Sequence, residues 1–97
     1  MDIYIVYDSH YEDSDIISAP IRVVQNAEKI VQDFFDWLNH SDIPDEYFVY
    51  INGHKCINCE TVGFVAWLNS HFLVEGEKAS IVKQHVKYKY GAYKIDF

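Results

Sequence analysis

The side chains with the most reactive chemistry lie close together in one short segment. His54, Cys56 and Cys59 are neighbours, and the two cysteines have the C-x-x-C spacing. This pattern suits either thiol–disulfide exchange or the coordination of zinc. A structural zinc site needs four ligands, however, and the remaining histidines do not follow at the spacing of a zinc finger. These histidines are His10, His40, His71 and His85.

A redox role for the same motif has one argument on each side. The motif precedes an expected helix, whose N-terminus would favour a thiolate. Both prolines, Pro20 and Pro44, come earlier in the chain, so the proline that follows the motif in thioredoxin-like proteins is missing. We therefore expect no cofactor and no metal, and interpret Cys56 as a small packed side chain. A redox or zinc module at His54, Cys56 and Cys59 stays the alternative.

Acidic residues are concentrated in the first half of the chain. Eleven of the fifteen Asp and Glu residues lie within residues 1–46, against only Arg22 and Lys29, for a net charge of −9. Residues 47–97 carry six basic and four acidic residues, a net charge of +2. Such asymmetry steers association with charged partners. Recognition by charge is therefore better supported than catalysis.

Three acidic segments are candidates for one partner-binding surface: the turn after the first strand, the polar side of the first long helix, and the loop behind that helix. We expect the helix to point its carboxylates away from the core. The loop starts where this helix ends, so its carboxylates would lie next to those of the helix. Two tyrosines, each adjacent in sequence to one of these acidic segments, would serve as aromatic anchors. The predicted partner-binding residues are Glu12, Asp13, Asp15, Asp33, Asp36, Asp42, Asp45 and Glu46, with Tyr11 and Tyr47.

These carboxylates form no recognisable catalytic or calcium motif. The acids of residues 8–15 lack the spacing of an EF-hand loop and its distal Glu. Asp33 and Asp36 share a helix face, but acid–base catalysis needs carboxylates in different environments within a cleft. Nucleophile-elbow, phosphate-loop and zincin motifs are missing from the sequence. We expect no enzymatic activity and no catalytic residues.

Basic residues are concentrated near the end, where residues 78–94 contain five lysines and no acid. Residues 82–90 alternate as a strand does, with Tyr88 and Tyr90 on the face opposite the basic side chains. The basic set consists of Lys83, His85, Lys87 and Lys89. Base stacking needs aromatic rings beside the cations, and a net charge of −7 repels phosphate. We expect no direct binding of nucleic acid, and interpret the lysines as protection of an edge strand.

Strand patterns occur in six parts of the chain. Residues 2–8 and 16–24 predict strands, the second with Pro20 at an edge or bulge. Residues 47–51 and 54–57 flank Asn52-Gly53, which favours a type I′ hairpin turn. Residues 82–90 and the short segment 93–97 complete the set.

Two segments have helical periodicity. Residues 27–39, behind Asn26 as N-cap, carry an apolar stripe that includes Ile30, Phe34 and Leu38. Residues 59–73, behind Asn58, are apolar on two sides, which we interpret as burial between layers of the core. In the alternative interpretation, Phe64 and Trp67, or else the final tyrosine-rich strand, form a dimer surface.

The chain of 97 residues is expected to form one domain, residues 1–97. The predicted fold class is α+β, with a largely antiparallel sheet of about four to six strands and two helices. The expected order is β-β-α-β-β-α-β(-β). No apolar run approaches the ~20 residues of a membrane span. The first residues lack the basic start of a signal peptide, and the small number of cysteines fits a reducing compartment. We therefore expect the cytosol of a bacterial host and no membrane partner.

The functional expectation is a non-enzymatic, acidic protein-binding module. The sharper hypothesis is an inhibitor from a phage or other mobile element that occupies the basic nucleic-acid-binding surface of a host protein. Antirestriction and anti-CRISPR inhibitors fit this description, and isoleucine-rich, lysine-rich usage favours such an origin. No diagnostic motif places the chain among them. Alternatives are the redox or zinc module and a structural or self-assembling phage protein, including a homodimer.

Overall fold

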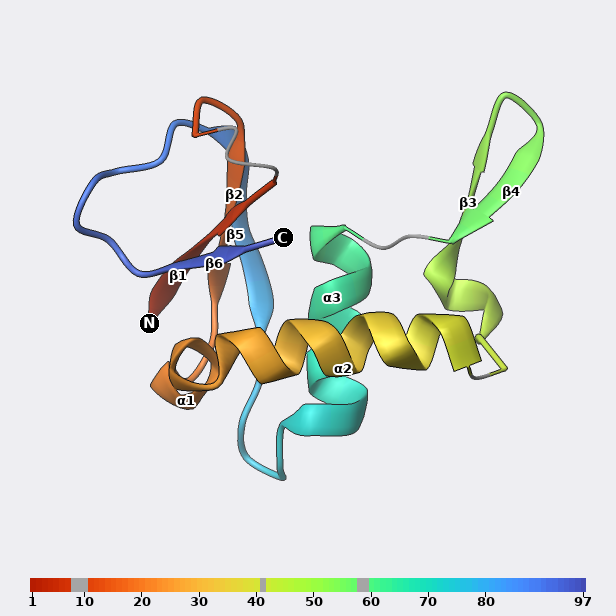
Figure 1. Cartoon of the computed structure of the whole chain (residues 1–97), viewed down its shortest axis with the longest axis horizontal. Helices are drawn as coiled ribbons and strands as arrows, with labels where there is room; N and C mark the ends of the chain where they lie inside the picture. Colours follow the sequence, from red (N-terminus) through yellow and green to blue (C-terminus); the bar gives the residue numbers. More distant parts are fainter. Residues whose placement is uncertain (8–10, 41, 58–59) are drawn as a thin grey trace.

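The computed structural model describes residues 1–7, 11–40, 42–57 and 60–97. They form a four-stranded mixed sheet, a separate two-stranded hairpin and helices (Figure 1). This arrangement confirms the predicted α+β class and, apart from an additional short α-helix and a short 3-10 helix, the predicted order of elements. None of the described helices is both long enough and apolar enough to cross a membrane.

The four-stranded sheet has two faces with different roles. Its order is β5 (Ser80–Val86), β2 (Ser14–Ser18), β1 (Asp2–Val6) and β6 (Lys94–Asp96). β1 pairs antiparallel with β2 and parallel with β6, so the predicted largely antiparallel sheet contains one parallel pair. Ile3, Ile5 and Ile17 are fully buried in the core. Side chains alternate along a strand, so Tyr4 lies on the opposite face.

The second strand ends earlier than predicted. β2 stops at Ser18, and residues 21–24, predicted as strand, belong to α1 (Ile21–Gln25). Pro20 precedes this helix at φ −61°, and its carbonyl accepts the Val23 N–H at 3.0 Å. Proline suits a helix start because its missing N–H would have no partner there. Val23 is fully buried, so tertiary packing outweighs the strand preference of its β-branched side chain.

The long helix forms as predicted, as α2 (Ala27–His40). Ile30, Phe34 and Leu38 of the expected stripe are buried. The predicted N-cap has another contact: the Asn26 side-chain amide donates to the Arg22 carbonyl at 2.8 Å, at the end of α1. The buried stripe leaves the polar side of α2 to solvent.

The hairpin also forms as predicted. β3 (Phe48–Ile51) follows a short 3-10 helix, η1 (Asp45–Tyr47), and pairs with β4 (His54–Ile57). The turn residues have the positive φ angles of a type I′ turn, 50° at Asn52 and 81° at Gly53. The pair is a sheet of its own and projects from the rest of the molecule (Figure 1).

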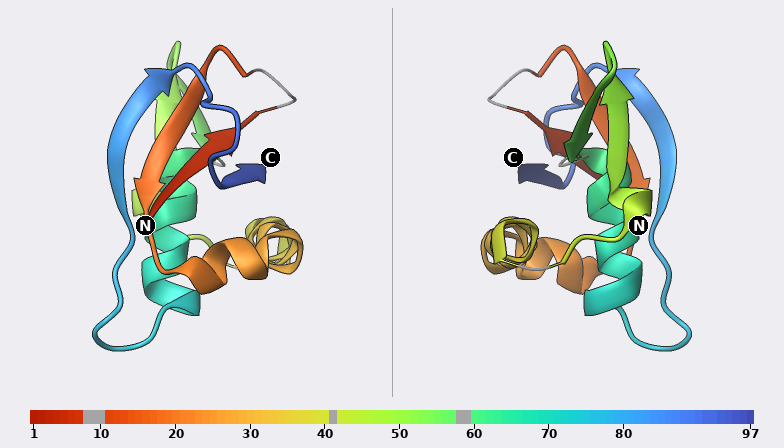
Figure 2. Two further views of the ribbon diagram at one scale, coloured as in Figure 1. Left: turned by 90° about the vertical axis from the view of Figure 1, so that its left-hand side faces the viewer. Right: turned by 90° about the vertical axis from the view of Figure 1, so that its right-hand side faces the viewer.

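The second predicted helix consists of α3 (Thr61–Trp67) and a π-helical turn, η2 (Leu68–Phe72). Phe64 and Trp67 are buried, and their rings lie 5.4 Å and 5.7 Å from that of Phe34 in α2. Figure 2 shows that α2 and α3 cross steeply. The core interpretation is therefore confirmed, and the alternative of a dimer surface at Phe64 and Trp67 is wrong.

The strand predicted for residues 82–90 is shorter than expected. β5 ends at Val86, because His85 adopts φ 58° and interrupts the extended backbone. Residues 87–93, which we call the tyrosine loop, lead to β6, the predicted final strand. The strict alternation therefore does not decide which way Tyr88 and Tyr90 point.

Candidate functional site

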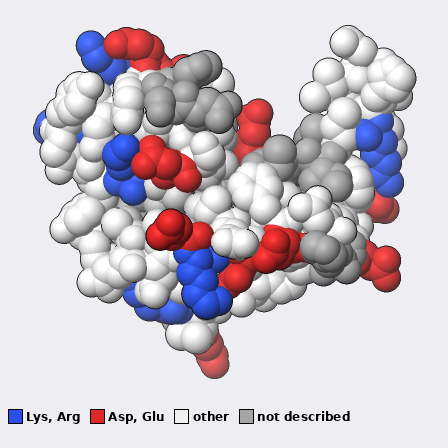
Figure 3. Space-filling model, viewed as in Figure 1, with Lys and Arg blue, Asp and Glu red and all other residues white. Residues whose placement is uncertain are grey.

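Exposed carboxylates run along α2 and the segment that follows it. We call Glu28, Asp33, Asp36, Asp42 and Asp45 the acidic strip. The first three line one shallow depression together with Lys29 and Gln32. Figure 3 shows acidic atoms along this face of α2. The buried stripe of α2 sets this arrangement, because it leaves the carboxylates only the solvent side of the helix.

Two lysines partly balance the acidic strip. Lys29 Nζ lies 2.8 Å from Asp33 Oδ2, and Lys55 Nζ lies 3.4 Å from Asp45 Oδ1. The Lys29 and Asp45 side chains are 78% and 96% exposed, so both pairs contribute little and open readily. Five carboxylates against two lysines leave the strip negative.

The acidic residues Glu12 and Asp13, in the turn before β2, do not lie beside this strip. Asp13 Oδ1 lies 2.9 Å from His85 Nδ1, and Glu12 Oε1 lies 3.7 Å from Lys87 Nζ. The hydrogen bond to Asp13 raises the pKa of His85. Residues 11–13 lie at the end of the sheet away from α2 (Figure 1). Basic residues near the C-terminus, His85 and Lys87, thus partly neutralise two of the predicted partner-binding carboxylates.

Asp15 is buried and cannot belong to an exposed surface. Its position opposite Ile5 in the β1–β2 register turns it to the core side of the sheet, where it is 6% exposed. Thr61 Oγ1 donates to Asp15 Oδ2 at 2.5 Å, and the His85 backbone N–H donates to Oδ1 at 3.1 Å. The carboxylate therefore joins β2 to α3 and to β5, which corrects its predicted role.

Tyr7 completes this buried network and caps α3. The Thr61 backbone N–H, which has no partner within the helix, donates to Tyr7 Oη at 2.7 Å. Tyr7 Oη also hydrogen-bonds Thr61 Oγ1. Burial raises the pKa of Tyr7 to about 12, so the phenol stays protonated at neutral pH. The sequence pointed to Asn58 as the cap, and Asn58 lies outside the described residues.

The network borders an open pocket of about 260 Å³. Its polar groups mainly bond one another, so their evident role is to join the strands to α3. No group of side chains in the described ranges has the arrangement of a metal site. The lining residues are Tyr7, Asp13, Asp15, Glu60, Gln84 and His85.

The C-x-x-C segment is only partly described. His54 is exposed in β4, and Cys56 is half-buried with its Sγ 3.7 Å from the His54 carbonyl oxygen. Cys59 lies outside the described residues. The alternative ligand set of His54, Cys56 and Cys59 therefore stays a prediction.

The two predicted aromatic anchors have different environments. Tyr47 is 1% exposed, and its ring packs 4.8 Å from that of Trp37, so it cannot anchor a partner. Tyr11 is partly exposed but belongs to a cluster with Tyr88 and Tyr90, beside the tyrosine loop. The side chain of Glu46 lies outside the described residues.

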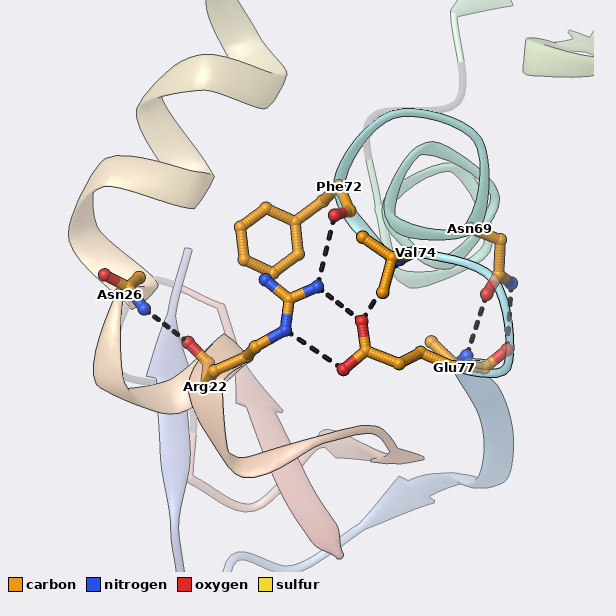
Figure 4. Close-up of polar contacts among 7 residues, drawn as sticks. Arg22, Asn26, Asn69, Phe72, Val74 and Glu77 are labelled. Atoms are coloured by element: carbon orange, nitrogen blue, oxygen red, sulfur yellow. Dashed lines mark hydrogen bonds and ion pairs between the residues drawn. The ribbon is translucent and has the colours of Figure 1, made fainter.

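A second polar network, absent from the sequence predictions, clamps α1 to residues 73–79 (Figure 4). Arg22 forms a two-pronged ion pair with Glu77, in which Nε donates to Oε2 at 3.1 Å. The guanidinium also lies 4.4 Å above the Phe72 ring. The Val74 N–H donates to the same carboxylate at 3.1 Å. The hydrogen bonds from Arg22 lower the pKa of Glu77 to about 2.

Comparisons with protein-family models, with curated proteins and with solved structures found no match.

Proposed function

We propose that this chain is a protein-binding module whose acidic strip docks on a basic surface of a partner protein. The observation that carries the proposal is the shared depression of Glu28, Asp33 and Asp36 on the solvent side of α2. Asp42 and Asp45 are exposed and follow α2 in the chain. A linear row of carboxylates on a rigid helix complements a basic groove in both shape and charge.

The chemistry of the strip favours a nucleic-acid-handling partner. Carboxylates and phosphates both accept hydrogen bonds from lysine and arginine, so the strip would occupy positions that otherwise hold a phosphate backbone. Such a contact excludes the nucleic acid, which is the action of an inhibitor. A phage or mobile-element inhibitor of a bacterial host protein is the specific form of this proposal, supported by acidity, small size and residue usage.

The test removes charge from the strip without disturbing the core. A Glu28→Gln/Asp33→Asn/Asp36→Asn variant should bind the partner at least about tenfold more weakly, with most of the loss in the association rate. The partner is first captured from a bacterial lysate at low and high salt, and binding is then measured with purified proteins. Circular dichroism checks that the variant is folded to the same extent as the unmodified chain.

A matched control removes the same charge elsewhere. Glu12→Gln/Asp13→Asn/Glu75→Gln changes the net charge equally, at carboxylates outside the strip, and should retain the affinity. Equal losses in both variants would show that binding follows net charge, and an unchanged affinity of the first variant would refute the proposal.

A further inference from the structure

The sheet face opposite the helices carries a cluster of four tyrosines. Tyr4 comes from β1, Tyr11 precedes β2, and Tyr88 and Tyr90 belong to the tyrosine loop. Tyr88 packs edge-on against both Tyr4, at 5.2 Å, and Tyr90, at 5.6 Å. Tyr11 and Tyr90 lie 6.2 Å apart with rings only 29° from parallel. Tyr88 is 7% exposed, whereas Tyr90 is 80% exposed.

The backbone holds Tyr90 at the apex of an ordered turn. The Ala92 N–H donates to the Lys89 carbonyl at 3.0 Å, and Gly91 takes the φ of 90° that the turn requires. The Tyr88 hydroxyl donates to the Ala92 carbonyl at 2.6 Å. Tyr90 is thus an exposed ring in a fixed position, so a planar ligand that stacks on it loses little ordering entropy.

Lysines lie beside these rings. Lys89 is exposed and forms no ion pair with any described residue. Lys87 has a long, exposed pair with Glu12, of the kind that contributes little. Lys94 Nζ lies 5.1 Å from the centre of the Tyr11 ring. Lys94 thus contacts a ring of the cluster, and the exposed Lys87 and Lys89 flank Tyr88 in the tyrosine loop, where β5 no longer separates basic from aromatic residues.

We propose that the tyrosine loop binds single-stranded nucleic acid. A base stacks on the open face of Tyr90, and the adjoining phosphates bind Lys87 and Lys89. An exposed aromatic ring between cations is the usual construction of sequence-tolerant single-strand binding. Duplex bases have their faces covered, so the loop selects single strands.

Much of the net charge of −7 comes from the acidic strip, whereas Glu12 and Asp96 pair with Lys87 and Lys94 beside the loop. The acidic strip lies on α2, which packs against the other face of the sheet, as Ile30 and Phe34 share the core with Ile3 and Ile5. In Figure 1 the tyrosine loop lies to the left of the sheet and α3 to its right. Charges separated by more than about 8 Å are largely screened at physiological salt.

The test is fluorescence anisotropy with labelled oligo-dT and oligo-U of about 15 nucleotides. Tyr90→Ala should weaken binding roughly 5- to 100-fold, whereas Tyr90→Phe keeps the ring and the affinity. Lys87→Gln/Lys89→Gln should reduce the salt slope of the affinity by about 1.4, for two phosphate contacts. Because Tyr90 is 80% exposed, we expect its replacement to leave the fold intact, and circular dichroism checks this expectation.

The control variants replace the same residue types, a tyrosine and a lysine, at positions outside the tyrosine loop. Tyr50→Ala removes a tyrosine that is 73% exposed on the hairpin, and Lys78→Gln removes an exposed lysine outside the loop. Both should bind as the unmodified chain does. The proposal is overturned if Tyr90→Ala binds no more weakly than Tyr50→Ala. It is also overturned if neither oligonucleotide binds at about 0.1 mM and low salt, or if duplex DNA competes equally well.

Discussion

Asp13 and Asp15 lie two residues apart and have opposite environments. Asp13 is exposed and pairs with the imidazole of His85, whereas Asp15 is buried and accepts hydrogen bonds from Thr61 and the His85 backbone. The difference follows from the position of each residue relative to the register of β2. At the residue scale, a charge count thus identifies acids but not their availability to a partner.

The Arg22–Glu77 clamp predicts a specific dependence of stability on pH. The pKa of Glu77 falls from 4.5 to about 2 on folding, so the unfolded chain takes up this proton at a higher pH than the folded chain. The stabilisation is complete above about pH 5 and is lost as the pH falls toward about 2. The Tm difference between the unmodified chain and Glu77→Gln should therefore be largest near neutral pH and shrink through this window.

Thermal unfolding followed by circular dichroism between about pH 2 and pH 7 measures this difference. Glu75→Gln, at an exposed neighbouring carboxylate, serves as control and should show a Tm difference that is small and flat. A constant Tm difference for Glu77→Gln would contradict the assignment.

At the scale of elements, the hairpin differs from the rest of the fold. β3 and β4 pair only with each other, and Tyr50 and Ile51 beside the turn are 73% and 56% exposed. Isolated two-stranded hairpins are marginally stable in water. The hairpin should therefore open locally, without unfolding of the four-stranded sheet.

Gly53→Ala tests this local opening. An alanine at φ 81° costs about 1–2 kcal/mol, because its Cβ is crowded in the left-handed conformation. Hydrogen exchange should accelerate at the amides of β3 and β4 and stay unchanged in β1 and β2. Gly76→Ala imposes the same strain in another loop, at φ 89°, and should leave the hairpin amides unchanged. Equal acceleration in both sheets would mean that the hairpin opens only on global unfolding.

At the scale of the whole molecule, one aromatic core connects the sheet with α2 and α3. The ring of Phe34 contacts those of Phe64, Trp67 and Phe97. Phe97 follows β6, and its N–H donates to the Val6 carbonyl at 2.8 Å. Elements from both ends of the chain therefore meet at one side chain, and a single domain stays our prediction.

This prediction requires one cooperative transition. Urea unfolding monitored by tryptophan fluorescence, which reports Trp37 and Trp67, should coincide with unfolding monitored by far-ultraviolet circular dichroism. Phe34→Ala should lower the free energy of unfolding by about 3–5 kcal/mol and shift both transitions together. A shift in only one of them would indicate that the layers unfold separately. Phe48→Ala, on the hairpin, is the control and should shift neither transition by a comparable amount.

Local patterns determined much of the fold. The spacing of Ile30, Phe34 and Leu38 predicted α2, and Asn52-Gly53 predicted the hairpin, because periodicity and turn geometry depend on neighbouring residues alone. The same logic failed at residues 21–24 and 87–90. There, burial of Val23 and the positive φ of His85 outweighed the local preference for strand.

The sequence by itself determined that acidic residues are concentrated in the first half of the chain and lysines near its end, and that the apolar stripe of the helix leaves Asp33 and Asp36 on its polar side. Only the tertiary structure decided which of the other charged side chains are exposed and which pair with one another. It buried Asp15 where it bonds to Thr61 of α3, and it placed Lys94 over the ring of Tyr11. The physical reason is that strand register and loop closure set distances between residues far apart in the chain, and no local pattern encodes those distances.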